Sequence, residues 1–207
     1  MTFSIVARQG TSYGVAVASK FLAVGAVVPA ARLGTGAAAT QARARVAYKQ
    51  DLLSTMMRGA TAARALAAVT AEDLNASERQ VGVVGARDAA TFTGADCLPW
   101  AGGLTGEVDG AQYAIQGNIL VGPEVIEAME SAFIEAASQP FTRRLIAALM
   151  AGDAVGGDRR GRQSAALYAV APRAGYDRSG VLADLRVDDH PDATAELARL
   201  SELNDAL

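Results

Sequence analysis

Thr2 is the first residue whose type and place could do chemistry. It follows the initiator methionine and opens the apolar segment TFSIVA. A residue as small as threonine permits removal of Met1, and the freed α-amine, with a pKa of about 8, can then take the proton of the Thr2 hydroxyl group. Thr2 therefore predicts a nucleophile that carries its own general base. The alternative is an ordinary strand residue behind an initiator methionine.

Lys20 is the second candidate, because it ends the next apolar segment, GVAVASK, and the chain has only one other lysine, Lys49. A cation beside the Thr2 hydroxyl would favour its deprotonated form. We therefore expect Lys20 to assist the nucleophile. The alternative is a solvated lysine at the end of a strand.

A third group lies in the loop DRRGRQS, where we predict substrate-binding roles for Asp158, Arg160, Arg162 and Ser164. Guanidinium groups in a glycine-containing loop suit a carboxylate or a phosphate. The loop is not a P-loop, because no Gly-Lys-Ser/Thr follows it and the next element reads as a strand. The alternative is an Arg–Asp network that braces two layers or a subunit interface.

The remaining reactive residues are weaker candidates. His190, the only histidine, lies in DDHPD, which could hold a metal or serve a hydrolase, but no second His or Cys cluster supplies further ligands. We favour a polar turn in which Asp192 stands near the start of the last helix. Cys97 could pair with His190 as a nucleophile, yet a small buried hydrophobe is the better reading. We expect no metal and no cofactor.

Composition limits the class of protein. The 207 residues suit a single domain, 1–207, and 51% hydrophobic against 20% charged residues indicates a compact globular chain. The net charge of −3 argues against a nucleic-acid surface. One cysteine forms no internal disulfide, and the apolar segments are too short for a membrane span and unlike a signal peptide. We therefore expect a cytoplasmic protein that acts on a small molecule, without nucleic-acid or membrane partners.

Elements that would position these residues follow from periodicity. Apolar runs predict strands at 2–8, 13–19, 23–32 and 34–41, which together set a sheet, with a hairpin at Gln9–Ser12. Three- and four-residue spacing predicts a helix over 48–69, broken near Gly59 and capped again by Thr61. Residues 79–86 and 89–94 read as a hairpin, and 100–110 as a glycine-rich link. Further strands are expected at 111–116, 164–170 and 183–187, and further helices at 125–137, 140–151 and 193–203.

Blocks of strands that alternate with pairs of helices predict an α/β fold. The motifs MTFSIVA, GVAVASKFLAVGAVVP, ATQA, RQVGVV, FTG, YAIQGNIL, GGDRRGRQSAAL and DLRVDDHPD resemble those of domain of unknown function 1028, a family placed among the N-terminal-nucleophile (Ntn) hydrolase-like proteins. The resemblance covers almost the whole chain. It implies a four-layer αββα sandwich, with two packed, mainly antiparallel sheets and helices on both outer faces.

The resemblance also implies roles for residues. Thr2 is similar to the terminal nucleophile, whereas Lys20 stands where proteasome-like chains carry an aspartate. Backbone amides at Thr40 and Gln41, together with Asn118, are the implied stabilisers of an oxyanion. Asp158 falls where related chains bring a polar group towards the nucleophile. After ATQA the chain reads RARVAYKQ instead of the usual Asn-Pro-like loop and Tyr-Gly-Pro element, which predicts a different substrate preference.

Two functions follow as expectations. The first is an Ntn-type amidohydrolase that cleaves a small amide through Thr2, with a substrate carboxylate held by Arg160 or Arg162. The second is a non-catalytic scaffold of the same fold that binds a metabolite or assembles as a homo-oligomer. A metal hydrolase built on the DDHPD segment is a distant third.

Overall fold

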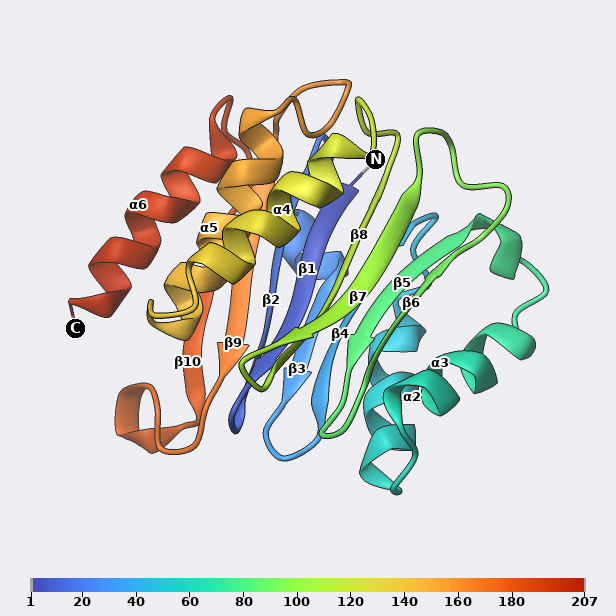
Figure 1. Cartoon of the computed structure of the whole chain (residues 1–207), viewed down its shortest axis with the longest axis horizontal. Coiled ribbons are helices and arrows are strands. Elements are labelled where there is room, and N and C mark those ends of the chain that lie inside the picture. Colours follow the sequence, from blue (N-terminus) through green and yellow to red (C-terminus); the bar gives the residue numbers. More distant parts are fainter. Residues whose placement is uncertain (1, 207) are drawn as a thin grey trace.

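A computed structural model describes residues 2–206 as a mixed α/β protein with two antiparallel sheets (Figure 1). Within these residues there are ten strands and six α-helices. The strands are β1 (Thr2–Gln9), β2 (Ser12–Ser19), β3 (Pro29–Arg32), β4 (Gly36–Ala42), β5 (Arg79–Val84), β6 (Ala89–Thr93), β7 (Gly102–Val108), β8 (Ala111–Asn118), β9 (Ser164–Val170) and β10 (Val181–Val187). The helices are α1 (Val24–Val27), α2 (Ala47–Met57), α3 (Ala62–Ala71), α4 (Glu124–Glu135), α5 (Phe141–Ala154) and α6 (Ala193–Asp205), with short 3₁₀ turns η1 (Ala76–Glu78) and η2 (Tyr176–Arg178).

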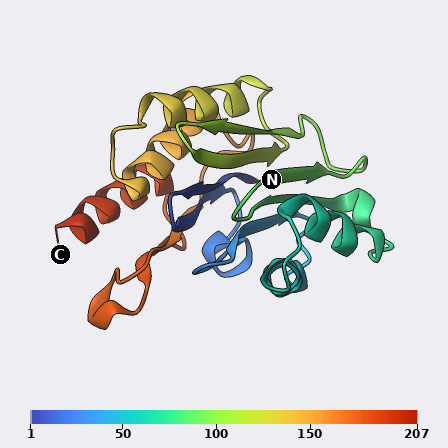
Figure 2. The same cartoon turned by 60° about the horizontal axis from the view of Figure 1, so that its bottom comes forward.

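The larger sheet has the strand order β10-β9-β2-β1-β8-β7, and the smaller one has the order β3-β4-β5-β6. Helices α4, α5 and α6 contact the larger sheet, and α2 and α3 contact the smaller one. The two sheets contact each other through β1 with β4 and through β5 with β8. Figure 2 shows the strands between these two groups of helices.

The alternation of side chains along β1 explains why this strand lies near the centre. Phe3, Ile5 and Ala7 join the core under α4–α6, whereas Val6 joins the core between the sheets. Because successive side chains of a strand point to opposite faces, Thr2 and Ser4 share the inner face with Val6. The start of β1 therefore presents hydroxyl groups to the space between the sheets.

Most predicted elements are confirmed. The hairpin of β1 and β2 is present, although both strands extend further, so that only Gly10 and Thr11 connect them. The long helical segment is divided into α2 and α3 around Gly59. Thr61 caps α3, since its side chain accepts a hydrogen bond from the amide of Arg64.

The prediction of one sheet from the first four strands is wrong. The expected strand at 23–32 is divided into α1 and β3, and the chain passes at this point from the larger sheet to the smaller one. Ala23 takes a left-handed backbone conformation (φ 54°), and the amide of Val24 donates to Ser164 Oγ at 3.0 Å. Because the residue that caps α1 lies 140 positions away, local periodicity could not reveal this turn.

The prediction of a glycine-rich link at 100–110 is also wrong, because this segment contains the strand β7. A methyl group on Gly102 would lie 2.6 Å from the ring of Trp100, and one on Gly106 would lie 2.2 Å from the hydroxyl of Tyr113. Aromatic rings therefore occupy the space that side chains of the strand would fill. Glycine is needed at these positions because aromatic side chains lie close to the backbone, so these glycines do not indicate a flexible segment.

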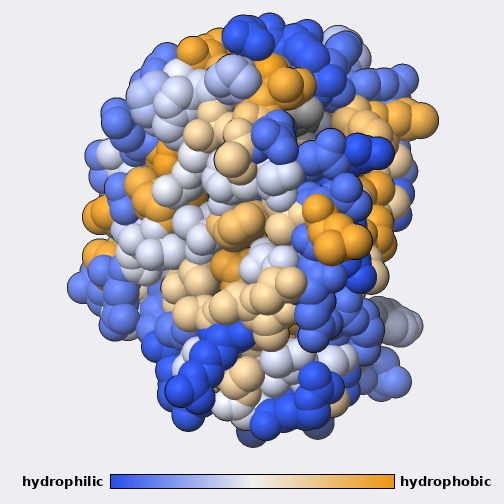
Figure 3. Space-filling model, turned by 90° about the vertical axis from the view of Figure 1, so that its right-hand side faces the viewer, coloured by the Kyte–Doolittle hydropathy of each residue, from blue (hydrophilic) through white to orange (hydrophobic). Residues whose placement is uncertain are grey.

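No helix among residues 2–206 is both long and apolar enough to cross a membrane. On the side of the molecule seen in Figure 3, hydrophobic surface occurs in separate groups with hydrophilic residues and residues of intermediate hydropathy between them. Single exposed apolar side chains such as Leu74 and Leu98 are ordinary for a protein surface.

Candidate functional site

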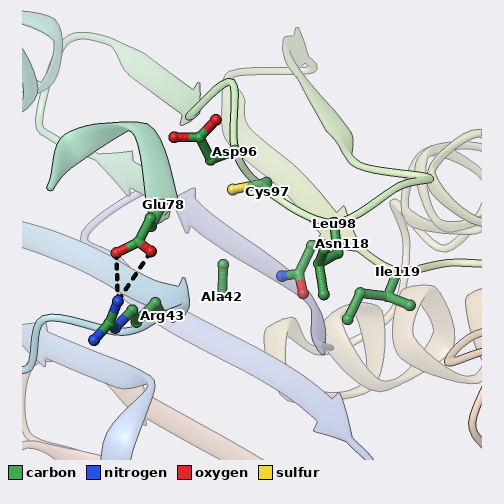
Figure 4. Close-up of a pocket in the computed structure, with 8 residues that line it drawn as sticks. All are labelled: Ala42, Arg43, Glu78, Asp96, Cys97, Leu98, Asn118 and Ile119. Atoms are coloured by element: carbon green, nitrogen blue, oxygen red, sulfur yellow. Dashed lines mark hydrogen bonds and ion pairs between the residues drawn. The ribbon is translucent and has the colours of Figure 1, made fainter.

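A cavity of about 440 Å³ opens where β4 and β8 end, close to the start of β1. Its lining comes from Ala42, Arg43, Glu78, Asp96, Cys97, Leu98, Asn118 and Ile119 (Figure 4). This volume falls in the range of small-molecule sites, about 300–1,000 Å³. The lining combines charged, amide and apolar groups.

Two residues of the lining have unusual backbones. Ala42 has φ 65° and Ile119 has φ 52°, so both take the left-handed conformation that favours glycine. For a β-branched residue such as isoleucine this is a marked outlier. Backbone strain of this kind clusters at functional sites, which supports a functional role for this cavity.

Thr2 lies beside the cavity through its strand partner Asn118. The Thr2 hydroxyl is 3.1 Å from the hydroxyl of Ser19, and Thr2 is only 6% exposed. Met1, whose removal the nucleophile hypothesis needs, lies outside the described residues. The structure thus joins the expected nucleophile to a second hydroxyl that the sequence did not single out.

Two side-chain amides hold the backbone carbonyl of Thr2. Gln41 Nε2 donates to Thr2 O at 3.2 Å, and Asn118 Nδ2 donates to the same oxygen at 3.4 Å. Both residues are almost completely buried between the sheets. The structure therefore brings together three of the four predicted catalytic residues, with Gln41 and Asn118 in contact with the main chain of Thr2.

Gln80 is the centre of this buried network. Its Oε1 accepts from Gln41 Nε2 at 2.8 Å and from Asn118 Nδ2 at 2.9 Å. Its Nε2 donates to Gly117 O at 2.7 Å and to Thr93 Oγ1 at 2.9 Å. Gln80 thereby fixes which way the two carboxamides around Thr2 point.

Ser4 fixes the other side of Gln41. The Ser4 hydroxyl donates to Gln41 Oε1 at 2.7 Å and accepts from Gln116 Nε2 at 2.6 Å. With its oxygen engaged by Ser4, Gln41 must present its amide nitrogen to Thr2. Within residues 2–206, hydrogen bonds thus orient each carboxamide that touches Thr2.

Two of the expected oxyanion donors are engaged elsewhere in this structure. The backbone amide of Thr40 donates to Val28 O at 3.2 Å. The side-chain amide of Asn118 is directed at Gln80 and Thr2. The contacts of Gln41 and Asn118 are those of residues that position Thr2.

Lys20 is exposed, and its ammonium donates to the carbonyl of Arg162 at 3.2 Å. Its backbone amide donates to the buried carboxylate of Asp158 at 2.7 Å. Among residues 2–206 no hydrogen bond joins Lys20 to the Thr2 side chain. In the described residues, Lys20 joins the end of β2 to the loop before β9.

The predicted substrate-binding residues are largely paired with one another or with nearby groups. Arg160 forms an ion pair with Asp158 at 3.4 Å, and Arg162 forms one with Asp153 at 2.7 Å. The buried Ser164 hydroxyl accepts a hydrogen bond from the amide of Val24 and donates one to the carbonyl of Phe21. These contacts fit the bracing network that was the alternative for this loop.

Cys97 and His190 lie in different surroundings. The Cys97 thiol lines the cavity and donates to Arg79 O at 3.3 Å, and burial raises its pKa. His190 Nδ1 accepts from the backbone amide of Asp192 at 3.0 Å in the turn before α6. Among residues 2–206 no group of three or more His, Cys, Asp or Glu side chains is placed to hold a metal ion.

Ser4, Ser19, Gln80 and Gln116 were not predicted as site residues. A signal for them exists in the sequence, because polar residues recur at every second position in strands that are otherwise apolar, as in TFSIVA and AIQGN. In a strand buried on both faces, such a pattern indicates a polar layer on one face. Which partners these residues meet depends on the packing of the two sheets.

Comparisons with known proteins agree on one family. The sequence profile described as "Family of unknown function (DUF1028)" matches residues 2–197. The crystal structure of protein SPO2555 from Silicibacter pomeroyi, labelled with the same family, is 30% identical and has a TM-score of 0.86. The match covers 98% of this chain and 88% of that one. Among curated proteins no match was found.

Proposed function

The chain belongs to the family of unknown function DUF1028, and we propose that it is an Ntn-type amidohydrolase whose nucleophile is Thr2 after removal of Met1. The proposal includes the four-layer αββα sandwich of that superfamily. The contacts of α2 and α3 with the smaller sheet, of α4–α6 with the larger sheet, and of the sheets with each other support this fold.

The observation that carries the proposal is the junction of Thr2 and the cavity at Asn118. Asn118 is the strand partner of Thr2, donates to its carbonyl at 3.4 Å and also lines the cavity. A substrate in this cavity would therefore lie against Asn118, the residue that pairs with Thr2. Gln41 and Asn118, oriented by Gln80, would hold that residue in place.

In the proposed reaction the α-amine of Thr2 takes the hydroxyl proton, and Oγ1 attacks the carbonyl carbon of the amide. The tetrahedral intermediate collapses with cleavage of the C–N bond, and the α-ammonium group protonates the leaving amine. Water, deprotonated by the same amine, then attacks the ester that links the acyl group to Thr2. The products are a carboxylic acid and an amine, and Thr2 is regenerated.

Two predicted roles are modified in this proposal. Lys20 would act through its charge and without contact with Thr2, because its ammonium is bound to the carbonyl of Arg162. The carboxylate preference assigned to Arg160 and Arg162 is left out, because both guanidinium groups have carboxylate partners of their own.

A covalent probe tests the proposal without knowledge of the substrate. Two chains are compared: one released from a removable N-terminal domain so that Thr2 is the first residue, and one in which Gly-Ser precedes a retained Met1. A β-lactone opened by Thr2 adds its whole mass as an ester, which intact mass and peptide mapping detect. We expect labelling of the first chain and none of the second.

Substitutions at Thr2 complete this test. Thr2→Ser retains a hydroxyl and should be labelled, whereas Thr2→Val keeps the shape of threonine without the hydroxyl and should not be. Labelling of the valine variant, or equal labelling of the chain with retained Met1, contradicts the proposal. Circular dichroism on each variant shows that the fold is unchanged.

A non-catalytic scaffold of the same fold is the second candidate. The observation in its favour is that the Thr2 hydroxyl is buried and already hydrogen-bonded to Ser19. A chain with free Thr2 that no lactone or amide acylates would favour this alternative.

A further inference from the structure

The cavity beside Thr2 offers more hydrogen-bond acceptors than donors. Within residues 2–206, no hydrogen bond or ion pair reaches the carboxylate of Asp96. Asn118 is 2% exposed, and its side-chain nitrogen is bound to Gln80 and Thr2. No residue among 2–206 donates to its Oδ1, which gives the lining a second acceptor besides Asp96.

Several donors of the same lining are already engaged. The thiol of Cys97 donates to Arg79 O, and the Asn118 amide has the partners given above. Arg43 Nη1 donates to both carboxylate oxygens of Glu78, at 2.9 and 2.8 Å. Arg43, the cation among the described residues of the lining, therefore has an anion partner, and 72% of its side chain is exposed.

The two acidic residues are held side by side by the main chain. The amide of Asp96 donates to Ser77 O at 2.7 Å, next to Glu78. A methyl group on Gly94 would lie 2.3 Å from the same Ser77 oxygen, so glycine permits this close approach. This backbone contact brings the loop that carries Asp96 to the turn that carries Glu78, so both carboxylates line the same cavity. In Figure 4 both side chains flank the space above Ala42.

We propose that this cavity binds the cationic end of the substrate, an ammonium or guanidinium group, through Asp96 and the Oδ1 atom of Asn118. Two carboxylates and one guanidinium give the lining a net negative charge. A ligand rich in N–H donors can donate to both Asp96 and Asn118 Oδ1, whereas a carboxylate would be repelled by Asp96. The assignment rests on the proposed function only in calling the ligand a substrate.

Cys97 provides a readout that does not depend on catalysis, because a ligand in the cavity shields the thiol from a neutral alkylating agent. The full chain with Thr2 as its first residue is treated with iodoacetamide at pH 8.5, alone or with n-butylguanidinium, butyramide or butyrate. These probes share a short chain and differ in charge. Intact mass gives the rate of alkylation at this single cysteine.

We expect n-butylguanidinium to slow alkylation about fivefold when it is present at about four times its Kd, since protection equals 1 + [L]/Kd. Butyrate at the same concentration should not protect. Asp96→Asn should abolish protection by the cation, and Asp96→Lys should transfer it to butyrate. Asp51→Asn, which removes an exposed carboxylate on α2 outside the cavity, is the matched control and should keep it.

Equal protection by butyrate, no protection by the cation, or full protection in the Asp96→Asn variant overturns the assignment. The outcome is separate from that of the hydrolase proposal. Protection of Cys97 without lactone labelling of Thr2 leaves a cation-binding cavity on a non-catalytic protein. Labelling without protection leaves a hydrolase whose substrate carries its charge elsewhere.

Discussion

Replacing Gln80 by methionine tests whether the buried carboxamides support the start of β1. Methionine has nearly the length and volume of glutamine but removes both the acceptor and the donor. Gln80 is 0% exposed, so the substituted side chain would have no water to replace the lost hydrogen bonds. The variant should therefore fold to the same structure with a lower free energy of unfolding.

The magnitude follows from the partners that remain. Asn118 Nδ2 would keep only its 3.4 Å contact with Thr2 O, whereas Gln41 Nε2 would keep acceptors at 3.2 and 3.3 Å. The carbonyl of Gly117 would lose its 2.7 Å donor. About two buried groups are thus left without a good partner, at about 1–3 kcal/mol each. We expect Gln80→Met to lower the free energy of unfolding by about 2–6 kcal/mol.

Urea denaturation followed by circular dichroism measures this change as a shift of the midpoint at constant slope. Gln50→Met is the control, because Gln50 lies on the exposed surface of α2 and should change the free energy by no more than about 0.5 kcal/mol. A Gln80→Met variant as stable as the control would refute the argument that the hydrogen bonds of Gln80 stabilise the fold.

Three further predictions concern other parts of the fold. The hydrogen bond from Arg79 lowers the pKa of Asp73 despite burial. The carboxylate therefore stabilises the fold above about pH 4, and this contribution is lost as pH falls further. Thermal unfolding from pH 6 to 2.5 should show that the unchanged protein is more stable than Asp73→Asn and that this difference in stability shrinks below pH 4. Burial and the hydrogen bond to Glu130 raise the pKa of Tyr113 to about 12, so the contribution of this hydrogen bond to stability is present below about pH 10 and is lost as pH rises to 12. Thermal unfolding from about pH 8 to 12 should show this alkaline loss in the unchanged protein and not in Tyr113→Phe. A methyl group at Gly82 would lie 2.0 Å from Oε1 of the buried Gln116 on the facing sheet. Gly82→Ala should therefore lower the free energy of unfolding by about 1–3 kcal/mol. Urea denaturation measures this change, and an unchanged midpoint would contradict the close packing of the two sheets.

The sequence predicted the elements whose signals are local. The division of the long helical segment at Gly59, with Thr61 as the cap, depends on neighbouring residues and was confirmed. The turn into α1 depends on Ser164, and β7 depends on aromatic rings that cover its glycines, so both were misread. Long-range packing decides these segments, and no window of the sequence contains it.

For the candidate site, too, the sequence could predict what depends on local residues and not what depends on long-range packing. Thr2 could be singled out because its chemistry depends on its own place in the chain. Gln41 and Asn118 were named from resemblance as stabilisers of an oxyanion, yet their contacts with the Thr2 carbonyl come from strand pairing and from Gln80. The acceptor-rich lining of the cavity joins residues from four separate segments, and only the fold brings them together.

The position of β1 inside the larger sheet has a consequence for how the protein is made. One edge of β1 pairs with β2 as soon as the hairpin forms, but the other edge pairs with β8, about 100 residues later in the chain. At ordinary rates of translation the apolar edge of TFSIVA would wait roughly 5–20 s for its partner. During that interval it is an open template for pairing with other chains, so slow translation before β8, or shortage of chaperones, should reduce the soluble yield first.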